Sequence, residues 1–202
     1  MSEKISIIGI GGLPRSGKDM LAEIIIGSGF YGVSLGDIVR DISRTRHADK
    51  PDPISRVNTT ETSNWLRQQK GPDFALKEAL EMYKKASQSN SYKGILVWSV
   101  RAPVEVDFIL ANNGQLIWVE TSDAIRHERA MHNLREGELV ISLEEFKRQE
   151  NEQWKPKPEL PAEIQMNVSY VKDKATLYLE NNSNSINEYN KKATELLNKI
   201  KF

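Results

Sequence analysis

The chain alternates short, uniformly apolar runs with longer stretches in which apolar residues recur at helical spacing. Short runs rich in β-branched residues and bounded by glycine or polar residues are typical of buried strands. Such runs predict five strands, at residues 4–10, 30–35, 94–100, 115–121 and 176–181. The first helical pattern follows the first strand, with one apolar face formed by Met20, Leu21, Ile24 and Ile25.

Helical spacing predicts further helices between and after the strands, at residues 37–46, 59–86, 103–111, 123–136, 143–153 and 188–200. The segment 59–86 is expected in two pieces, because Gly71 can end one helix and Pro72 can begin the next. Strands that alternate with helices predict an α/β fold, a five-stranded parallel sheet with helices on both faces. We expect one domain over residues 1–202, with ligands beyond the C-terminal ends of the strands.

A phosphate-binding pattern lies between the first strand and the first helix. Residues 12–18, GLPRSGK, fit G-x-x-x-x-G-K, the Walker A pattern. The glycines let successive backbone N–H groups point into one concavity, and the helix that follows presents its positive end there. Lys18 would reach the β- and γ-phosphates of a nucleotide. The predicted nucleotide site comprises Gly12, Arg15, Ser16, Gly17, Lys18, Asp19 and Met20.

Asp19 stands where such loops usually carry Ser or Thr, the side chain that ligates Mg²⁺. A carboxylate can also hold Mg²⁺, directly or through water, because it is a hard oxygen donor. Alternatively, Asp19 is an acid in the first turn of a helix, where the dipole favours it. The residue pattern leaves both interpretations open, and Asp19 is the candidate metal ligand.

Composition narrows the function classes. The 202 residues contain 28 Lys and Arg and 28 Asp and Glu, which argues against sequence-independent binding to nucleic acid or acidic membranes. With no cysteine, the chain has no disulfide, Cys-based zinc site or thiol nucleophile. His127 and His132 are wrongly spaced for two metal ligands on one helical face. The apolar run 5–13 is too short and too glycine-rich for a membrane span, so we expect a cytoplasmic protein.

The motifs "GLPRSGKD" and "VSLGDIVRD" resemble the adenylate-kinase-like superfamily of nucleotide kinases. Within it, the chain is most similar to archaeal-type kinases described as dephospho-CoA-kinase-like or nucleoside monophosphate kinase-like. Other families of that superfamily, the phage deoxynucleoside monophosphate kinases and animal phosphomevalonate kinases, also carry "SGKD", so Asp19 has precedent. The resemblance implies an ATP-dependent kinase that uses ATP and Mg²⁺ and a small phosphorylated acceptor. We expect a monomer or a homodimer, and the sequence does not decide between them.

The resemblance also implies roles for individual residues. The segment of about 37–90 would bind the acceptor, with Arg40 on its phosphate, and "VRAPVEV" would place Arg101 on the transferring phosphoryl group. The implied acceptor residues are Ser34, Gly36, Asp37, Arg40 and Arg101. A lid of about 126–155 would cover ATP with Arg126, Arg129, Arg135 and Arg148. Arginine suits such roles because its planar fork binds two phosphate oxygens, although any one of these arginines could instead be a solvated surface charge.

The third predicted strand lacks an expected acid. In this family it usually ends in an Asp that supports Mg²⁺, whereas here Trp98 and Ser99 stand at that place. The indole could fill the core or stack on a base. Asp37 and Glu120 are candidates to compensate. Without either, Mg²⁺ would be held only by ATP oxygens, waters and Asp19, and turnover would be slow or absent.

Three functions therefore compete. The first is a kinase with Lys18, Arg40 and Arg101 as catalytic residues and a nucleoside monophosphate as acceptor. The second is a kinase for dephospho-CoA, whose hydroxyl acceptor calls for a general base, but Gly11 and Gly12 stand in the region where the family carries one. The third is a nucleotide-binding sensor or scaffold with little turnover, as the missing strand-end acid suggests.

Overall fold

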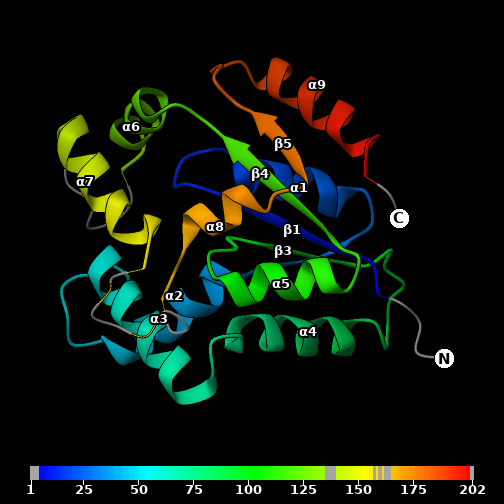
Figure 1. The fold of residues 1–202 in the computed structure, drawn as a ribbon, viewed down its shortest axis with the longest axis horizontal. Helices are drawn as coiled ribbons and strands as arrows, with labels where there is room; N and C mark the ends of the chain where they lie inside the picture. Colours follow the sequence, from blue (N-terminus) through cyan, green and yellow to red (C-terminus); the bar gives the residue numbers. More distant parts are fainter. Residues whose placement is uncertain (1–4, 135–139, 157, 159–160, 162–164, 201–202) are drawn as a thin grey trace.

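The centre of the molecule is a five-stranded parallel sheet with strand order β2-β3-β1-β4-β5, covered by helices on both faces (Figure 1). The computed structural model describes residues 5–134, 140–156, 158, 161 and 165–200. The strands are β1 (Ile7–Gly12), β2 (Tyr31–Ser34), β3 (Ile95–Trp98), β4 (Gln115–Glu120) and β5 (Leu177–Glu180). This confirms the predicted fold class.

Helix α2 begins directly after β2, whereas a short loop separates α1 from β1. Their bounds are α1 (Lys18–Gly27), α2 (Leu35–Arg46), α3 (Arg56–Lys70), α4 (Phe74–Ala86), α5 (Pro103–Ala111), α6 (Asp123–His132), α7 (Leu143–Trp154), α8 (Val168–Asp173) and α9 (Ile186–Leu197). No helix in these described parts is long and apolar enough to cross a bilayer.

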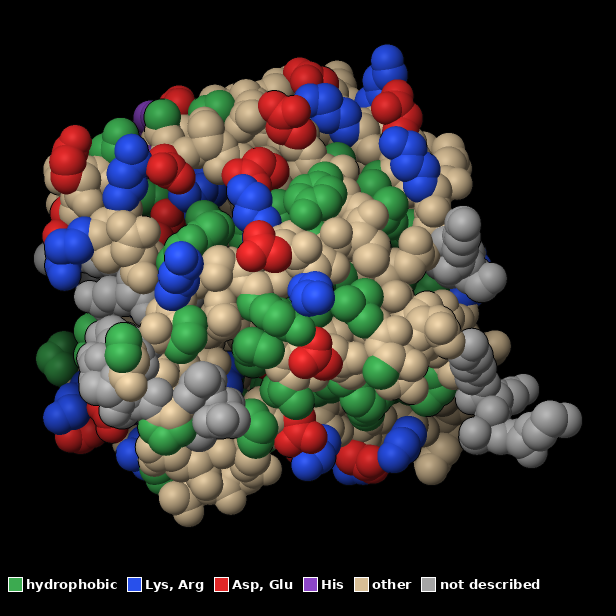
Figure 2. Space-filling model, viewed as in Figure 1, with side chains coloured by type: hydrophobic (Ala, Val, Ile, Leu, Met, Phe, Trp, Pro, Cys, Tyr) green, Lys and Arg blue, Asp and Glu red, His purple; other side chains and the backbone are tan. Residues whose placement is uncertain are grey.

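Two apolar cores hold the layers together. One face of the sheet packs on α1 and α9 through Leu21, Ile25 and Leu196, which are at most 4% exposed. The other face packs on α4, α5 and α8, with Ile109 and Val171 fully buried. The central strands β1, β3 and β4 are therefore apolar on both faces and read as continuous apolar runs, whereas the edge strand β5 exposes Tyr178 and Glu180 on one face. Over the face shown in Figure 2, charges of both signs are interspersed, as the zero net charge leads one to expect.

Serine caps set three helix starts earlier than predicted, and one of them is α9, which begins at Ile186 after Ser185 instead of at residue 188. The Ser34 hydroxyl accepts the backbone N–H of Asp37, so α2 begins at Leu35 instead of residue 37. The Ser55 hydroxyl accepts the N–H of Asn58 in the same way, so α3 begins at residue 56 instead of 59. The predicted break between α3 and α4 is confirmed, with Gly71 at a φ of 94°.

The short helix α8 was not predicted. Its six residues are too few to show a helical period, and Asn167 caps it by accepting the N–H of Tyr170. The helix α6 ends at His132, earlier than the predicted end at 136, and residues 135 and 136 lie outside the described residues.

Candidate functional site

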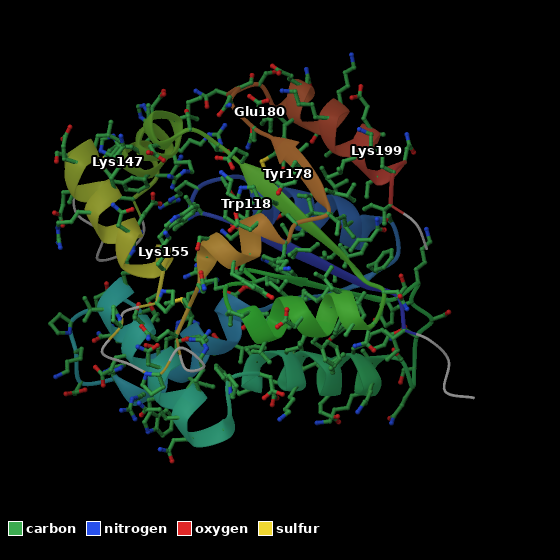
Figure 3. All side chains as sticks on the ribbon, in the orientation of Figure 1. Trp118, Lys147, Lys155, Tyr178, Glu180 and Lys199 are labelled. Atoms are coloured by element: carbon green, nitrogen blue, oxygen red, sulfur yellow. The ribbon has the colours of Figure 1, made fainter. Side chains whose placement is uncertain are left out.

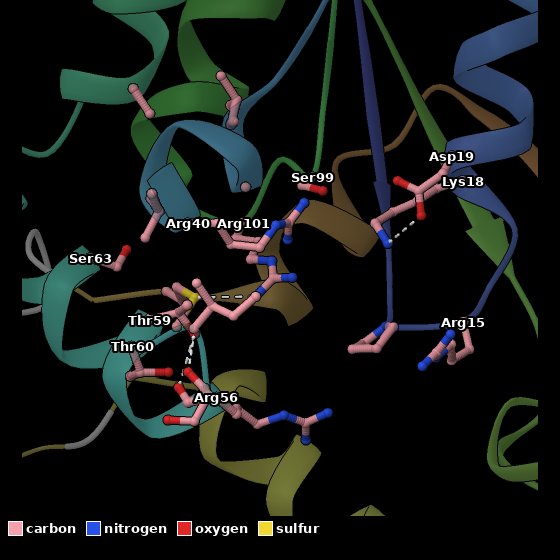
Figure 4. Close-up of a pocket in the computed structure, with 18 of the residues that line it drawn as sticks. Arg15, Lys18, Asp19, Arg40, Arg56, Thr59, Thr60, Ser63, Ser99 and Arg101 are labelled. Carbon is pink, nitrogen blue, oxygen red and sulfur yellow. Dashed lines mark hydrogen bonds and ion pairs between the residues drawn. The ribbon is translucent and has the colours of Figure 1, made fainter. Parts of the chain in front are cut away.

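An open cleft of about 370 Å³ lies at the C-terminal ends of β1 and β3. One wall is the loop that joins β1 to α1, with Arg15, Lys18 and Asp19. The opposite wall is formed by α2, α3 and the turn after β3, with Arg40 and Arg101 among its side chains (Figure 4). Ala130 and Met131 of α6 and Phe146 of α7 also line the cleft.

The loop after β1 adopts a conformation that its glycines permit. Gly17 has a φ of 94°, and an added Cβ would lie 2.4 Å from Nδ2 of Asn181. Arg15 also has a positive φ, of 64°, which is uncommon for a residue with a side chain. Strain of this kind concentrates where a backbone is shaped for a ligand.

Contacts from behind the loop turn its carbonyl groups away from the cleft. The Ser16 carbonyl accepts the Asn181 side-chain amide at 2.8 Å, and the Gly17 carbonyl accepts the Tyr189 hydroxyl at 2.7 Å. In a trans peptide the next N–H points opposite to the carbonyl, so the N–H groups of Gly17 and Lys18 point to the other side. The Ser16 hydroxyl is buried and has no partner among the described residues. The loop thus offers donors of the kind that hold phosphate oxygens.

Lys18 and Asp19 place one positive and one negative charge at the loop. Nζ of Lys18, which is nearly buried, lies 3.6 Å from Oδ2 of Asp19. The Asp19 side chain is 59% exposed and accepts the indole N–H of Trp98 on its other oxygen at 3.0 Å. A carboxylate next to a candidate phosphate site fits Mg²⁺, which usually binds through one or two carboxylates together with substrate phosphates and waters.

The two acids that could have compensated for the missing strand-end Asp are engaged elsewhere. Glu120 accepts the indole N–H of Trp118 at 2.6 Å and pairs with Lys172 at 2.7 Å. Asp37 forms an ion pair with Arg40. Within the described ranges, no three His, Asp or Glu side chains cluster as a metal site would require. Asp19 is therefore the acid that lies at the loop.

Four arginines, which we call the arginine wall, line the side of the cleft that faces the loop: Arg40, Arg56, Arg67 and Arg101. Removal from water, together with the positive charges of Arg40, Arg56 and Arg67, lowers the pKa of Arg101 to about 10, while the charge of Glu105 opposes the shift. Arg101 still carries its charge at neutral pH. Converging guanidinium groups of this kind are suited to a phosphate or carboxylate.

The arginine wall is braced by Glu105 at the start of α5. Its Oε2 accepts the backbone N–H groups of Arg101 at 2.8 Å and Ala102 at 3.0 Å, and its Oε1 lies 3.9 Å from Arg67. Burial lowers the pKa of Arg67, and the charge of Glu105 opposes that shift. Nη1 of Arg67 donates to Ser63, while its buried Nε has no partner among the described residues.

Sequence reasoning placed the acceptor on the segment of about 37–90 but named no side chain of α3, which contributes to this wall. Five polar side chains of α3 line the cleft, namely Arg56, Thr59, Thr60, Ser63 and Arg67. They recur three or four residues apart and so share one helical face. That spacing was visible in the sequence, but polar residues on a helix usually face solvent, and only the packing of α3 shows which face is covered.

No protein-family model matches the chain. It is 28% identical over 198 residues to a UPF0200 protein of Thermococcus onnurineus, an alignment that covers 96% of this chain and 97% of that protein. Among solved structures, a shikimate kinase of Bacteroides thetaiotaomicron matches with a TM-score of 0.54 at 10% identity, over 96% of this chain and 97% of that one. TT1252 of Thermus thermophilus matches with a TM-score of 0.52 at 16% identity, over 98% and 96% of the two chains.

The fold is that of the P-loop kinases. This likeness, at 10 and 16% identity, extends to the architecture alone. It agrees with the five-stranded parallel sheet and its strand order.

The structure brings six of the predicted site residues into the cleft: Arg15, Lys18, Asp19, Gly36, Arg40 and Arg101. Other predicted residues lie beside it without lining it. Ser34 is buried as the cap of α2, and Asp37 orients Arg40. The remaining loop residues, Gly12, Ser16, Gly17 and Met20, shape the loop or follow it in α1 and are not part of the cleft lining.

The arginines assigned to a lid have different surroundings. Arg126 is 1% exposed, forms an ion pair with Glu150 and donates to the Pro14 carbonyl. Arg129 donates to the carbonyls of Arg15 at 3.3 Å and Ser183 at 2.7 Å.

Neither Arg126 nor Arg129 lines the cleft, and both donate to backbone carbonyls of the loop. Arg148 is exposed and pairs with Glu145 at 2.7 Å. Arg135 lies outside the described residues.

Proposed function

We propose that the chain is an ATP-dependent phosphotransferase whose acceptor is a nucleoside monophosphate. The observation that carries the proposal is the pairing of a phosphate loop with an arginine wall across one cleft. Phosphoryl transfer needs two polyanions held together and the charge on the transferring group neutralised. A site for one nucleotide alone would have no use for a second cationic wall.

The proposed roles follow from the two walls. Lys18 and the loop N–H groups hold the β- and γ-phosphates, while Arg40, Arg56 and Arg67 hold the acceptor phosphate. An acceptor phosphate oxygen attacks the γ-phosphorus, the bond from that phosphorus to the β,γ-bridging oxygen breaks, and ADP leaves. Arg101 neutralises charge on the transferring group. Asp19 would hold Mg²⁺ through its carboxylate, and this ion would supply further charge neutralisation on the ATP oxygens.

Two longer segments of the chain are assigned to the acceptor and to the nucleotide in the same way as the two walls. We assign acceptor binding to the segment of about 37–90, which contains α2, α3 and α4. We assign the lid to the segment of about 126–155, whose α6 and α7 contribute Met131 and Phe146 to the cleft lining. Closure of these helices over the nucleotide would exclude water, which otherwise competes as an acceptor.

One observation favours a second candidate, a nucleotide-binding sensor with little turnover. Asp19 is a lone carboxylate at the loop, and the strand-end position that usually adds an acid carries Trp98. Such a protein would bind ATP without acceptor-dependent release of ADP.

The deciding experiment measures ADP release from ATP–Mg²⁺ with a panel of acceptors, alongside the Lys18→Ala variant. The panel contains each nucleoside and deoxynucleoside monophosphate, dephospho-CoA and phosphomevalonate. We expect fast release with a nucleoside monophosphate and none with Lys18→Ala. A correctly folded Lys18→Ala protein with full activity would refute the proposal. Measurable ATP binding without release for any acceptor would favour the sensor, and release with dephospho-CoA alone would favour a hydroxyl acceptor.

A further inference from the structure

The acid that usually ends the strand beside the loop is found here in the loop's own helix, and the strand end carries a hydrogen-bond donor instead. In P-loop NTPases Mg²⁺ is usually held by a Ser or Thr hydroxyl after the loop lysine and by an Asp at a strand end. Here the carboxylate, Asp19, follows Lys18, and the strand end carries a hydrogen-bond donor, Trp98. The two side chains meet, because Nε1 of Trp98 donates to Oδ1 of Asp19 at 3.0 Å.

This hydrogen bond fixes a side chain that would otherwise move freely. Asp19 is on the first turn of α1 and is 59% exposed, so little packing restrains its rotamer. With Oδ1 held by the indole and Oδ2 3.6 Å from Nζ of Lys18, the plane of the carboxylate is set. Its exposed side remains directed into the cleft that it lines.

The indole itself is held rigidly. Trp98 is the last residue of β3 and lies in register with Ile10 on one side and Ser34 on the other. Its ring packs on the core that contains α1, and on Gly32, where an added Cβ would lie 3.2 Å from the ring. A donor on a sheet can position a functional group more accurately than a donor on a loop.

We propose that Trp98 is a positioning residue that orients the Asp19 carboxylate toward the metal of a bound metal–nucleotide complex. This inference rests on the proposed function in one respect, that a nucleotide binds at the phosphate loop. Trp98 does not line the cleft, which disfavours a role in stacking on a base. Core filling alone would not require the indole N–H to meet the one acid at the loop.

The test uses Trp98→Phe, which keeps an aromatic ring in the core and removes the donor. Mn²⁺ replaces Mg²⁺ as the probe, and its binding to the complex with a non-hydrolysable ATP analogue is measured by electron paramagnetic resonance. Loss of a partner that orients a metal ligand typically weakens metal binding by 10–100-fold, so we expect roughly tenfold weaker Mn²⁺ binding. Binding of the analogue without metal should stay within about twofold of wild type, because the loop N–H groups are untouched.

Trp118 provides a matched control, since it is also a strand tryptophan whose indole N–H donates to an acid, here Glu120 at 2.6 Å. Trp118 lies on β4 beside α8, with Lys172 over its ring, and it does not line the cleft (Figure 3). Trp118→Phe therefore removes an equivalent hydrogen bond elsewhere. We expect it to leave Mn²⁺ binding unchanged, whatever it costs in thermal stability.

A double-mutant cycle separates positioning from packing. If Trp98 acts through the carboxylate, Trp98→Phe should have little further effect on Mn²⁺ binding in an Asp19→Asn background. An equal loss in both backgrounds would overturn the inference, as would Trp98→Phe binding Mn²⁺ like wild type.

The inference and the proposed function fail in different ways. Suppose that no acceptor supports turnover, and that Trp98→Phe loses Mn²⁺ binding while Trp118→Phe does not. That result would refute the proposed kinase activity and support the positioning role of Trp98. Lys18-dependent turnover together with unchanged Mn²⁺ binding in Trp98→Phe would keep the kinase and refute the positioning role. A wild-type complex that takes up no Mn²⁺ at all would refute the positioning role directly.

Discussion

Substitution of Glu105 by glutamine removes a negative charge from the arginine wall and keeps the size of the side chain. The glutamine oxygen can still accept the backbone N–H groups of Arg101 and Ala102, which the carboxylate accepts at 2.8 and 3.0 Å. What it cannot replace is the attraction to Arg67, whose Nη2 lies 3.9 Å from Oε1. Both side chains of this pair are 4% exposed, so water cannot take over the lost partner.

The expected loss of stability follows from that distance. At an effective dielectric constant of 20, two unit charges 3.9 Å apart attract each other by roughly 4 kcal/mol. With the glutamine oxygen on the backbone N–H groups, its NH2 group would face Arg67, which can only donate, so no hydrogen bond replaces the attraction. We therefore expect a net loss of about 4 kcal/mol, within the range for breaking a buried ion pair. For a chain of this size that corresponds to a fall of roughly 8–16 °C in Tm.

Thermal unfolding followed by circular dichroism measures this change, with Glu145→Gln as the matched control. Glu145 pairs with Arg148 at 2.7 Å, but the two side chains are 35% and 64% exposed, so its loss should cost less than about 1 kcal/mol. Added inorganic phosphate should restore more Tm to Glu105→Gln than to wild type, because the variant has an additional uncompensated positive charge. A fall in Tm no larger than that of the control would refute the reasoning.

Two further substitutions test the two walls of the cleft separately. Gly17→Ala should abolish binding of a non-hydrolysable ATP analogue, as measured by isothermal titration calorimetry. Gly17 has a φ of 94°, and a new Cβ would lie 2.4 Å from Nδ2 of Asn181. Binding within twofold of wild type would contradict this. Arg56→Gln should raise the KM for the acceptor by roughly tenfold or more, the value of one charge-assisted hydrogen bond, and leave the KM for ATP nearly unchanged. Equal increases in both Michaelis constants would show that Arg56 does not belong to the acceptor wall alone.

The fold was accessible from the sequence because its signals are local. The central strands β1, β3 and β4 are apolar runs that the sheet buries on both faces, and each of the five predicted runs overlaps an observed strand. The errors lie at helix boundaries. Ser34, Ser55 and Ser185 cap helices that begin earlier than predicted, and α6 and α9 end earlier than predicted. The helix α8 has only six residues and escaped detection for lack of a period.

The site was accessible only in part. Lys18 and Asp19 were found from the loop pattern, and Arg40 and Arg101 from a resemblance, and all four line one cleft. Arg67 was missed because nothing local distinguishes a buried arginine on α3 from an exposed one. Its burial depends on Glu105, which lies 38 positions further along the chain, as the ion pair between them shows.

Arg126 and Arg129 show why residue type and spacing do not define a ligand contact. A guanidinium group binds carbonyl oxygens as well as phosphate oxygens, and in this structure the two arginines donate to the carbonyls of Pro14 and Arg15. Each carbonyl held from behind turns the following N–H away from that contact, because the trans peptide is planar. Both arginines can therefore shape the phosphate loop without lining the cleft themselves. If the loop binds a nucleotide as proposed, we expect loss of either arginine to weaken that binding through the backbone of the loop, although neither side chain lines the cleft.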